Sequence, residues 1–248
     1  MTSVKNLQQA QLTPEDLEKF QKIKRILWKI NMVFHNAEPN IGTLEKISDN
    51  YDFQWKRDEN SAEPMTRQEY LESHPEIQDP FNFSFSLSAE DIIEQKIPMR
   101  VMGCTGVAKL FAKFAEEEGL DCCAVYAAKI NDLEKQQEGS DDIVNGHQII
   151  AVQFSDGVRM FDPGCINGLQ FHKDNDGQEI VVPSMNMLLG EKLIPQDSND
   201  PWEQRQAGTV ITAIEPAQSL ERVESYEDLK RRYLPRASVQ QFRGMTNE

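Results

Sequence analysis

The chain has 248 residues, 39% of them apolar and 27% charged, which is enough to bury the core of one sizeable domain. Its 41 acidic residues outnumber 26 basic ones, giving a formal net charge of −15. Such a surface repels phosphate groups, so we expect no binding to nucleic acid or to a membrane surface, and a basic protein or peptide as the favoured partner. No stretch approaches the roughly 20 apolar residues that cross a bilayer. Nothing in the sequence predicts an oligomeric state.

The amino-terminal residues and the cysteines bear on the compartment. Residues 1–6 show neither an apolar run nor a small-residue cleavage site, so we expect no secretory signal. Two of the cysteines, Cys122 and Cys123, are adjacent, which suits neither a disulfide framework nor the spacing of zinc and redox sites, and we interpret them as strand residues. A reducing, cytoplasmic location is expected, with export by a signal-less route left open.

Residues 1–87 are predicted to form a region of helix and loop. The segment Thr13-Pro14-Glu15-Asp16 is typical of a helix start, with a hydroxyl cap, a proline and then two acids. Apolar residues then recur at the spacing of a helix of about five to six turns: Leu17, Phe20, Ile23, Leu27, Ile30 and Phe34. Residues 35–80 are polar, with one short helix expected after Pro64. Aromatic and polar residues alternate from Phe81 to Leu87, which predicts a short strand.

Residues 88–248 show the pattern of a mixed helix and sheet core. Ser88 and Asp91 predict a capped short helix, and residues 104–118 a second helix that ends at Gly119. Apolar, β-prone runs then predict strands at 122–130, 147–154 and 158–161, with a polar loop at 131–145 and a turn at 155–157. Two strands are predicted around the turn 174–177, followed by a last strand at 210–214 and a helix at 226–233. We therefore expect an α+β fold with an antiparallel sheet packed on the helix that Cys104 begins.

Three residues in this core have the types and order of a thiol catalytic site. Cys104 would begin a helix, where the helix dipole and an imidazolium lower the pKa of a thiol. Gly103 and Gly106 would leave room for a substrate backbone, and free amide groups there could stabilise an oxyanion. His147 would act as the base, and Asp162, at the end of the strand that hairpins back from it, would orient the imidazole.

The order of these segments resembles the core of the transglutaminase-like superfamily over residues 88–164. The matching segments are Gly103-Cys104-Thr105-Gly106-Val107-Ala108-Lys109-Leu110-Phe111, Glu118-Gly119-Leu120, Gly146-His147 and Phe161-Asp162-Pro163. The resemblance implies a papain-like fold and a triad of Cys104, His147 and Asp162 that transfers an acyl group from a protein or peptide through a thioester. Water as acceptor would make a peptidase or amidase, and an amine would make a transglutaminase. It implies neither a cofactor nor a metal, and the turn 174–177 has no glycine or glutamate at the positions where a calcium loop requires them.

The sequence also departs from the family pattern. Where the family often has His-Ala-Trp, this chain has His147-Gln148-Ile149, and Gln95 stands too far before Cys104 to match the oxyanion donor of papain-like enzymes. The Arg-Gly-Gly-x-Cys segment of arylamine acetyltransferases is replaced here by Val101-Met102-Gly103 before the cysteine. A catalytically silent scaffold of the same fold that binds proteins is therefore the alternative.

Overall fold

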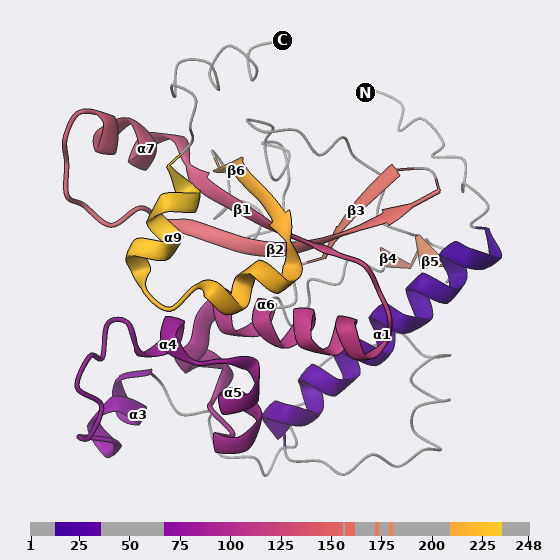
Figure 1. Cartoon of the computed structure of the whole chain (residues 1–248), viewed down its shortest axis with the longest axis horizontal. Coiled ribbons are helices and arrows are strands. Elements are labelled where there is room, and N and C mark those ends of the chain that lie inside the picture. The colour runs from indigo at the N-terminus through magenta and orange to yellow at the C-terminus, as the bar shows by residue number, and fades with distance from the viewer. Residues whose placement is uncertain are drawn as a thin grey trace.

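The computed structural model describes residues 13–35, 67–155, 157–161, 172–173, 179–180 and 209–234. Its elements are arranged as Figure 1 shows. In chain order they are α1 (Pro14–His35), α3 (Arg67–Ser73), α4 (Phe83–Ser86), α5 (Ala89–Gln95), α6 (Met99–Glu117), β1 (Cys123–Lys129), α7 (Ile130–Gln137), β2 (Gly146–Phe154), β3 (Gly157–Phe161), β4 (His172–Lys173), β5 (Glu179–Ile180), β6 (Thr209–Pro216), the 3-10 helix η1 (Ala217–Arg222) and α9 (Tyr226–Tyr233).

The sheet that positions the candidate site has four strands in the order β3-β2-β1-β6, and every neighbouring pair is antiparallel. Helix α6 packs against this sheet through β2, and α1 packs in turn against α6 (Figure 1). The prediction of a mixed α and β fold with an antiparallel sheet on the Cys104 helix is thereby confirmed at that level. The finer expectation of a papain-like core stays a prediction.

Because side chains alternate along a strand, the sheet has two distinct faces. The face toward α6 belongs to the main core, to which the strands contribute Ala124, Tyr126, Ala128, Ile150, Val152, Phe154, Phe161 and Val210. A second, smaller cluster comprises Val125, Ala127, Ile149, Ala151, Met160 and Ile211. In β1 and β2 the even-numbered apolar residues therefore join the main core, and the odd-numbered apolar residues join the second cluster.

Helix α1 begins as the sequence predicts. The Thr13 hydroxyl accepts a hydrogen bond from the Asp16 amide at 3.1 Å, and the Asp16 carboxylate accepts from the Thr13 amide in return. Asp16 is only 1% exposed because its carboxylate also accepts hydrogen bonds from the backbone amide and the hydroxyl of Ser155, in the turn between β2 and β3. These contacts anchor the start of α1 to the sheet.

The buried stripe of α1 is close to the predicted one. Its buried members are Phe20, Ile23, Ile26, Leu27 and Ile30. Leu17 was predicted in this stripe but is 52% exposed, because the buried position in its turn is taken by Asp16. The stripe belongs to the same core as α6, and the division of the chain at residues 87 and 88 stays a prediction.

Two local predictions are wrong. The alternating segment from Phe81 to Leu87 contains the helical turn α4 in place of a strand, since Asp79 accepts a hydrogen bond from the Asn82 amide and turns the chain. Part of the predicted loop at 131–145 is the helix α7, which Leu133 anchors by its complete burial. A local hydrogen bond decides the first segment and one buried side chain the second, and hydrophobic periodicity reveals neither.

The other predicted elements are confirmed, some of them shorter than expected. Helix α3 follows Pro64, and α5 has a capping box of Ser88 and Asp91. Helix α9 spans the predicted residues, while β4 and β5 have two residues each. None of the helices that the structure describes is both long and apolar enough to cross a membrane.

Lys109 is a buried cation that joins three segments of the fold. It lies in α6 and is 1% exposed. Its Nζ donates hydrogen bonds to the carbonyl oxygens of Phe85 at 2.8 Å, Leu87 at 2.7 Å and Val223 at 2.8 Å. Burial lowers its pKa, against the opposing effect of nearby acidic side chains. Since each proton of the ammonium group has an acceptor, Lys109 ties α6 to the segments before α5 and before α9.

Candidate functional site

Helix α6 is interrupted immediately before Cys104. Gly103 has φ 62° and ψ −164°, a backbone conformation that is accessible at low cost only to glycine. The regular helix therefore starts again at Cys104, as the sequence predicts. Such a start presents amide groups without intrahelical acceptors, and the helix dipole there favours a negative charge.

The thiol of Cys104 lies against a buried glutamine. Cys104 is half-buried, and its Sγ donates a hydrogen bond to Gln148 Oε1 at 2.9 Å. The hydroxyl of Thr105 donates to the same oxygen at 2.7 Å. Gln148 itself is 0% exposed, and its Nε2 has no hydrogen-bond acceptor among the residues that the structure describes.

Strand alternation explains why this partner is Gln148. Gln148 pairs with Tyr126 of β1 and shares its face, the one toward α6. His147 pairs with Ala127, whose side chain belongs to the cluster on the opposite face. A shift of one residue along a strand moves a side chain from one face to the other. The structure therefore brings Gln148 to the thiol, and it places the half-buried His147 on the opposite face; the role of His147 as a base stays a prediction.

The hairpin that was expected to carry the third residue is confirmed. Strands β2 and β3 pair antiparallel from Phe154 opposite Gly157 to Ile150 opposite Phe161. Asp162 and Cys165 lie outside the described residues, so the orienting role of Asp162 also stays a prediction.

Tyr233 packs against the residue that precedes His147 in β2. This last residue of α9 is 3% exposed, and its ring packs on the backbone of Gly146, where an added Cβ would lie 2.1 Å from the nearest ring atom. Burial above all raises the pKa of Tyr233 well above its usual value, and the proximity of Cys104 and of Tyr126 raises it further. The hydroxyl therefore stays protonated. The glycine before His147 is explained by this close approach.

Gly106 has a different role from the one expected. A Cβ at this position would lie 2.6 Å from the Cβ of Met102, so the space beside Gly106 holds the Met102 side chain in place of a substrate backbone. Gln95 is exposed at the end of α5. The sequence analysis therefore missed the side-chain amide that does reach Cys104. The alternation of β2 could have indicated it, since Gln148 is a polar residue in the inward series of Ile150 and Val152.

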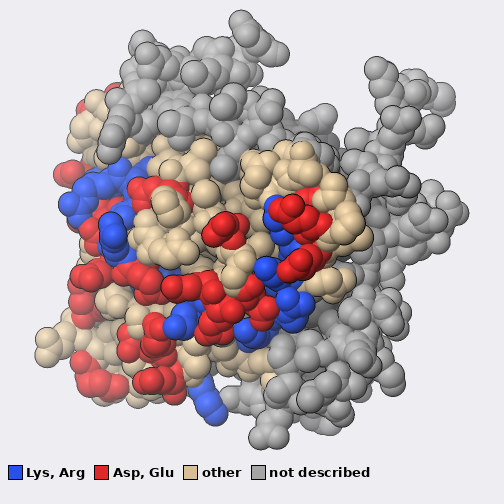
Figure 2. Space-filling model, turned by 45° about the vertical axis from the view of Figure 1, so that its right-hand side comes forward, with Lys and Arg blue, Asp and Glu red and all other residues tan. Residues whose placement is uncertain are grey.

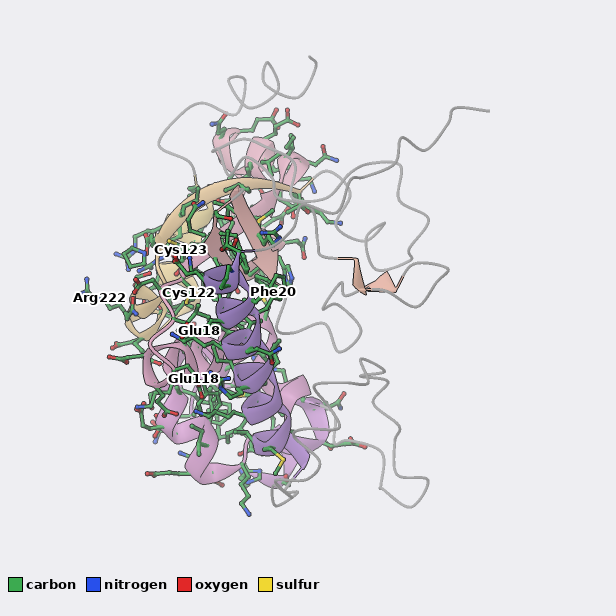
Figure 3. The ribbon with its side chains drawn as sticks, turned by 90° about the vertical axis from the view of Figure 1, so that its right-hand side faces the viewer. Glu18, Phe20, Glu118, Cys122, Cys123 and Arg222 are labelled. Atoms are coloured by element: carbon green, nitrogen blue, oxygen red, sulfur yellow. The ribbon has the colours of Figure 1, made fainter. Side chains whose placement is uncertain are left out.

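The two adjacent cysteines lie at the start of β1, where Cys123 is the first strand residue and Cys122 precedes the strand. Figure 3 shows Cys122 and Cys123 where this strand begins. Burial, followed by the proximity of Cys123 and Asp121, raises the pKa of Cys122 to about 12. The pKa of Cys123 is also raised, mainly by burial. Both thiols are therefore expected to react slowly. No group of three His, Cys, Asp or Glu side chains within the described ranges could hold a metal ion.

A hollow of about 560 Å³ lies away from the thiol, between α4 and the start of α9. Its acidic side chains include Asp79 and Asp228. Asp79 accepts a hydrogen bond from Asn82, and Asp228 accepts from Ser225 and Arg231. Because these carboxylates already have partners within the fold, we place the candidate site at Cys104.

The site consists of a half-exposed thiol, a restarted helix and a buried carboxamide. The carboxamide oxygen holds the protonated thiol in one orientation, and the restarted helix favours negative charge on its sulfur. No protein-family model matches the chain, and the comparisons with curated proteins and with solved structures find no match either.

Proposed function

We propose that the protein is a thiol enzyme that attacks amide bonds of a protein or peptide through Cys104. The observation that carries this proposal is the half-exposed thiol on a helix that starts again after Gly103. The Sγ thiolate would add to the amide carbonyl, and the amine would leave with a proton as the thioester forms. Water or a second amine would then release the acyl group and restore the thiol.

The order of elements around the thiol supports this chemistry. The Cys104 helix is followed by β1, by the strand that begins with Gly146 and His147, and by its hairpin partner β3. This is the order that the resemblance to transglutaminase-like enzymes implies. In the proposed reaction His147 takes the proton of the thiol and Asp162 orients the imidazole.

A catalytically silent scaffold is the second candidate, and one observation favours it. The thiol proton is donated to Gln148 Oε1, while strand alternation directs His147 toward the other face of the sheet. A base must come within hydrogen-bond reach of the thiol, or within reach of one bridging water, to take its proton. If that approach never occurs, Cys104 is a structural thiol and the fold serves to bind a protein.

The deciding experiment measures turnover of amides by wild type and by Cys104→Ala. Casein peptides would be incubated with each protein, with and without cadaverine as an amine acceptor, and analysed for cleaved bonds, released ammonia and attached amine. We expect turnover by wild type and none by Cys104→Ala, while Cys123→Ala, the matched control, retains it. Wild-type turnover no greater than that of Cys104→Ala would reject the enzyme and leave the scaffold.

A further inference from the structure

The two polar atoms of the Gln148 carboxamide differ in their hydrogen bonds. Its Oε1 accepts two hydrogen bonds, from the Cys104 thiol and the Thr105 hydroxyl, while its Nε2 donates none within the described part of the chain. A buried donor without an acceptor costs about 1–3 kcal/mol. Native proteins retain such groups rarely, and each one calls for an explanation. Here the unpaired donor belongs to the side chain that contacts the candidate nucleophile.

We propose that the Gln148 carboxamide turns over when Cys104 loses its proton, so that Nε2 then donates a hydrogen bond to the thiolate. This inference rests on the proposed function only in that it supplies the reactive form of the same thiol. The proton leaves Sγ for a base or for solvent, and the sulfur changes from a donor to an acceptor. A half turn about the Cγ–Cδ bond exchanges Oε1 and Nε2, which have nearly the same size.

The Thr105 hydroxyl can keep a hydrogen bond to the carboxamide before and after this exchange. Its hydroxyl donates to Oε1 in the structure described here. A hydroxyl can also accept, so it can receive a hydrogen bond from Nε2 after the turn. In both states of Cys104 the sulfur and the Thr105 hydroxyl each have a partner in the carboxamide, and the atom without a partner is Nε2 in one state and Oε1 in the other.

Two tyrosines that lie close to this pair in the described part of the chain, Tyr233 and Tyr126, supply no charge to the thiol. Tyr233 of α9 lies near enough for its charge to interact with that of Cys104, and Tyr126 of β1 pairs with Gln148 across the sheet. Burial raises the pKa of Tyr233, and it raises that of Tyr126 to about 12, so both stay neutral. The Arg232 guanidinium lies over the Tyr126 ring, 5.6 Å from its centre. Strand alternation directs His147 toward the opposite face of β2.

A direct contact between Nε2 and a substrate oxygen is the competing role. It is less favoured because Nε2 is completely buried, and an oxygen of a substrate would have to displace packed side chains to reach it. The thiol sulfur, by contrast, is already in contact with the carboxamide.

The test is the pH dependence of Cys104 alkylation by iodoacetamide, resolved from the other cysteines by peptide mass spectrometry. Gln148→Met removes the donor at nearly constant volume, and Gln148→Glu keeps the shape but adds a negative charge. We expect the midpoint of the rate–pH curve to rise by about one pH unit in Gln148→Met, an approximately tenfold loss of rate at pH 7, and further in Gln148→Glu. Gln153→Met, at an exposed position of the same strand, is the control and should follow wild type.

The outcomes separate this inference from the proposed function. A raised midpoint in the Gln148 variants supports it even if wild type turns over no amide, in which case the enzyme proposal alone fails. Curves that superimpose on wild type overturn it, whether or not the protein is an enzyme. Unchanged alkylation together with slower amide turnover would assign Gln148 to the substrate oxygen and would also overturn it. If Gln148→Met does not fold, as judged by circular dichroism, Gln148→Leu takes its place, because it also removes the donor without adding a charge.

Discussion

The two ends of α6 are built from different kinds of interaction. At the carboxyl end, Glu118 pairs with Arg25 at 2.8 Å and with Lys29 at 2.9 Å, both from α1, and Figure 3 shows Glu118 beside this helix. Figure 2 shows acidic and basic side chains intermixed across the surface. At the restarted end the Cys104 thiol and the Thr105 hydroxyl donate to Gln148 Oε1, and the buried Nε2 of Gln148 has no acceptor among the described residues.

This difference indicates a division of roles along one helix. The carboxyl end holds α1 in place through its ion pairs. The restarted end contains a glycine conformation and a buried amide that lower stability, and folded proteins keep such costs mainly at functional sites. We therefore expect substitutions at the two ends to differ in kind, and Lys109 between them to have the largest effect on stability.

Lys109→Met should cause the largest loss of stability. The substitution leaves the carbonyl oxygens of Phe85, Leu87 and Val223 without their shared donor. We expect a loss of about 3 kcal/mol or more in the free energy of unfolding, measured by urea denaturation. Lys113→Met is the matched control, because Lys113 forms a partly exposed ion pair with Glu90, and it should cost less than about 1 kcal/mol. Equal losses in the two variants would contradict this account of Lys109.

Gly146→Ala should be the next largest effect, since its Cβ would overlap the ring of Tyr233. We expect a loss of about 2 kcal/mol in a wild-type background. In a Tyr233→Leu background, where the ring is gone, the same change should cost much less, which a double-mutant cycle measures as a coupling energy. Additive losses would mean that the ring and the glycine do not constrain one another.

Asp16→Asn tests the anchor of α1 through its pH dependence. Burial opposes ionisation of this carboxyl, but hydrogen bonds from Ser155 and Thr13 outweigh it and lower the pKa from 3.8 to about 2. A pKa lowered in the folded state means that the stabilisation is fully present above the unfolded value and is lost as the pH falls toward 2. Wild type should exceed Asp16→Asn by about 1–2 kcal/mol at pH 7.

Thermal unfolding of both proteins between pH 7 and pH 2 checks this expectation. The difference between them should be constant from pH 7 to pH 5 and should shrink below pH 4. A difference that grew in acid would show that the Asp16 carboxylate does not stabilise the fold.

Arg25→Ala should have the smallest effect. The Arg25 side chain is 44% exposed, and an exposed ion pair such as that with Glu118 contributes less than about 1 kcal/mol. Salt should reduce the effect further. Urea denaturation at low and at high ionic strength measures both expectations. A loss as large as that of Lys109→Met would contradict the contrast between an exposed pair and a buried cation.

Much of the fold follows from the sequence, since strong local signals specify it. The capping residues Ser88 and Asp91 and the long apolar stripe of α1 are short-range features that a single sequence reveals. Helices α4 and α7 were not predicted from the sequence, because contacts with other segments stabilise them. Phe83, for example, stacks on Tyr70 with ring centres 5.9 Å apart.

The candidate site was predictable in part. A glycine before a cysteine at the start of an apolar helix predicted the position of Cys104, and the structure agrees. The partner of the thiol was not predicted. The resemblance pointed to His147 without considering that side chains alternate along β2, and this alternation turns the neighbouring Gln148 toward α6. The three carbonyl oxygens that surround Lys109 come from segments far apart in the chain, and no pattern in the sequence brings them together.

The most direct test of the central claim is the relative reactivity of the cysteines in the folded wild-type protein. Limited iodoacetamide at pH 6–7, followed by peptide mass spectrometry, gives the labelling rate of each thiol. We predict that Cys104 is labelled fastest, about tenfold or more faster than Cys122 or Cys123, because burial raises the pKa values of these two thiols. Labelling of Cys104 no faster than that of Cys122 and Cys123 would contradict its role as the reactive thiol.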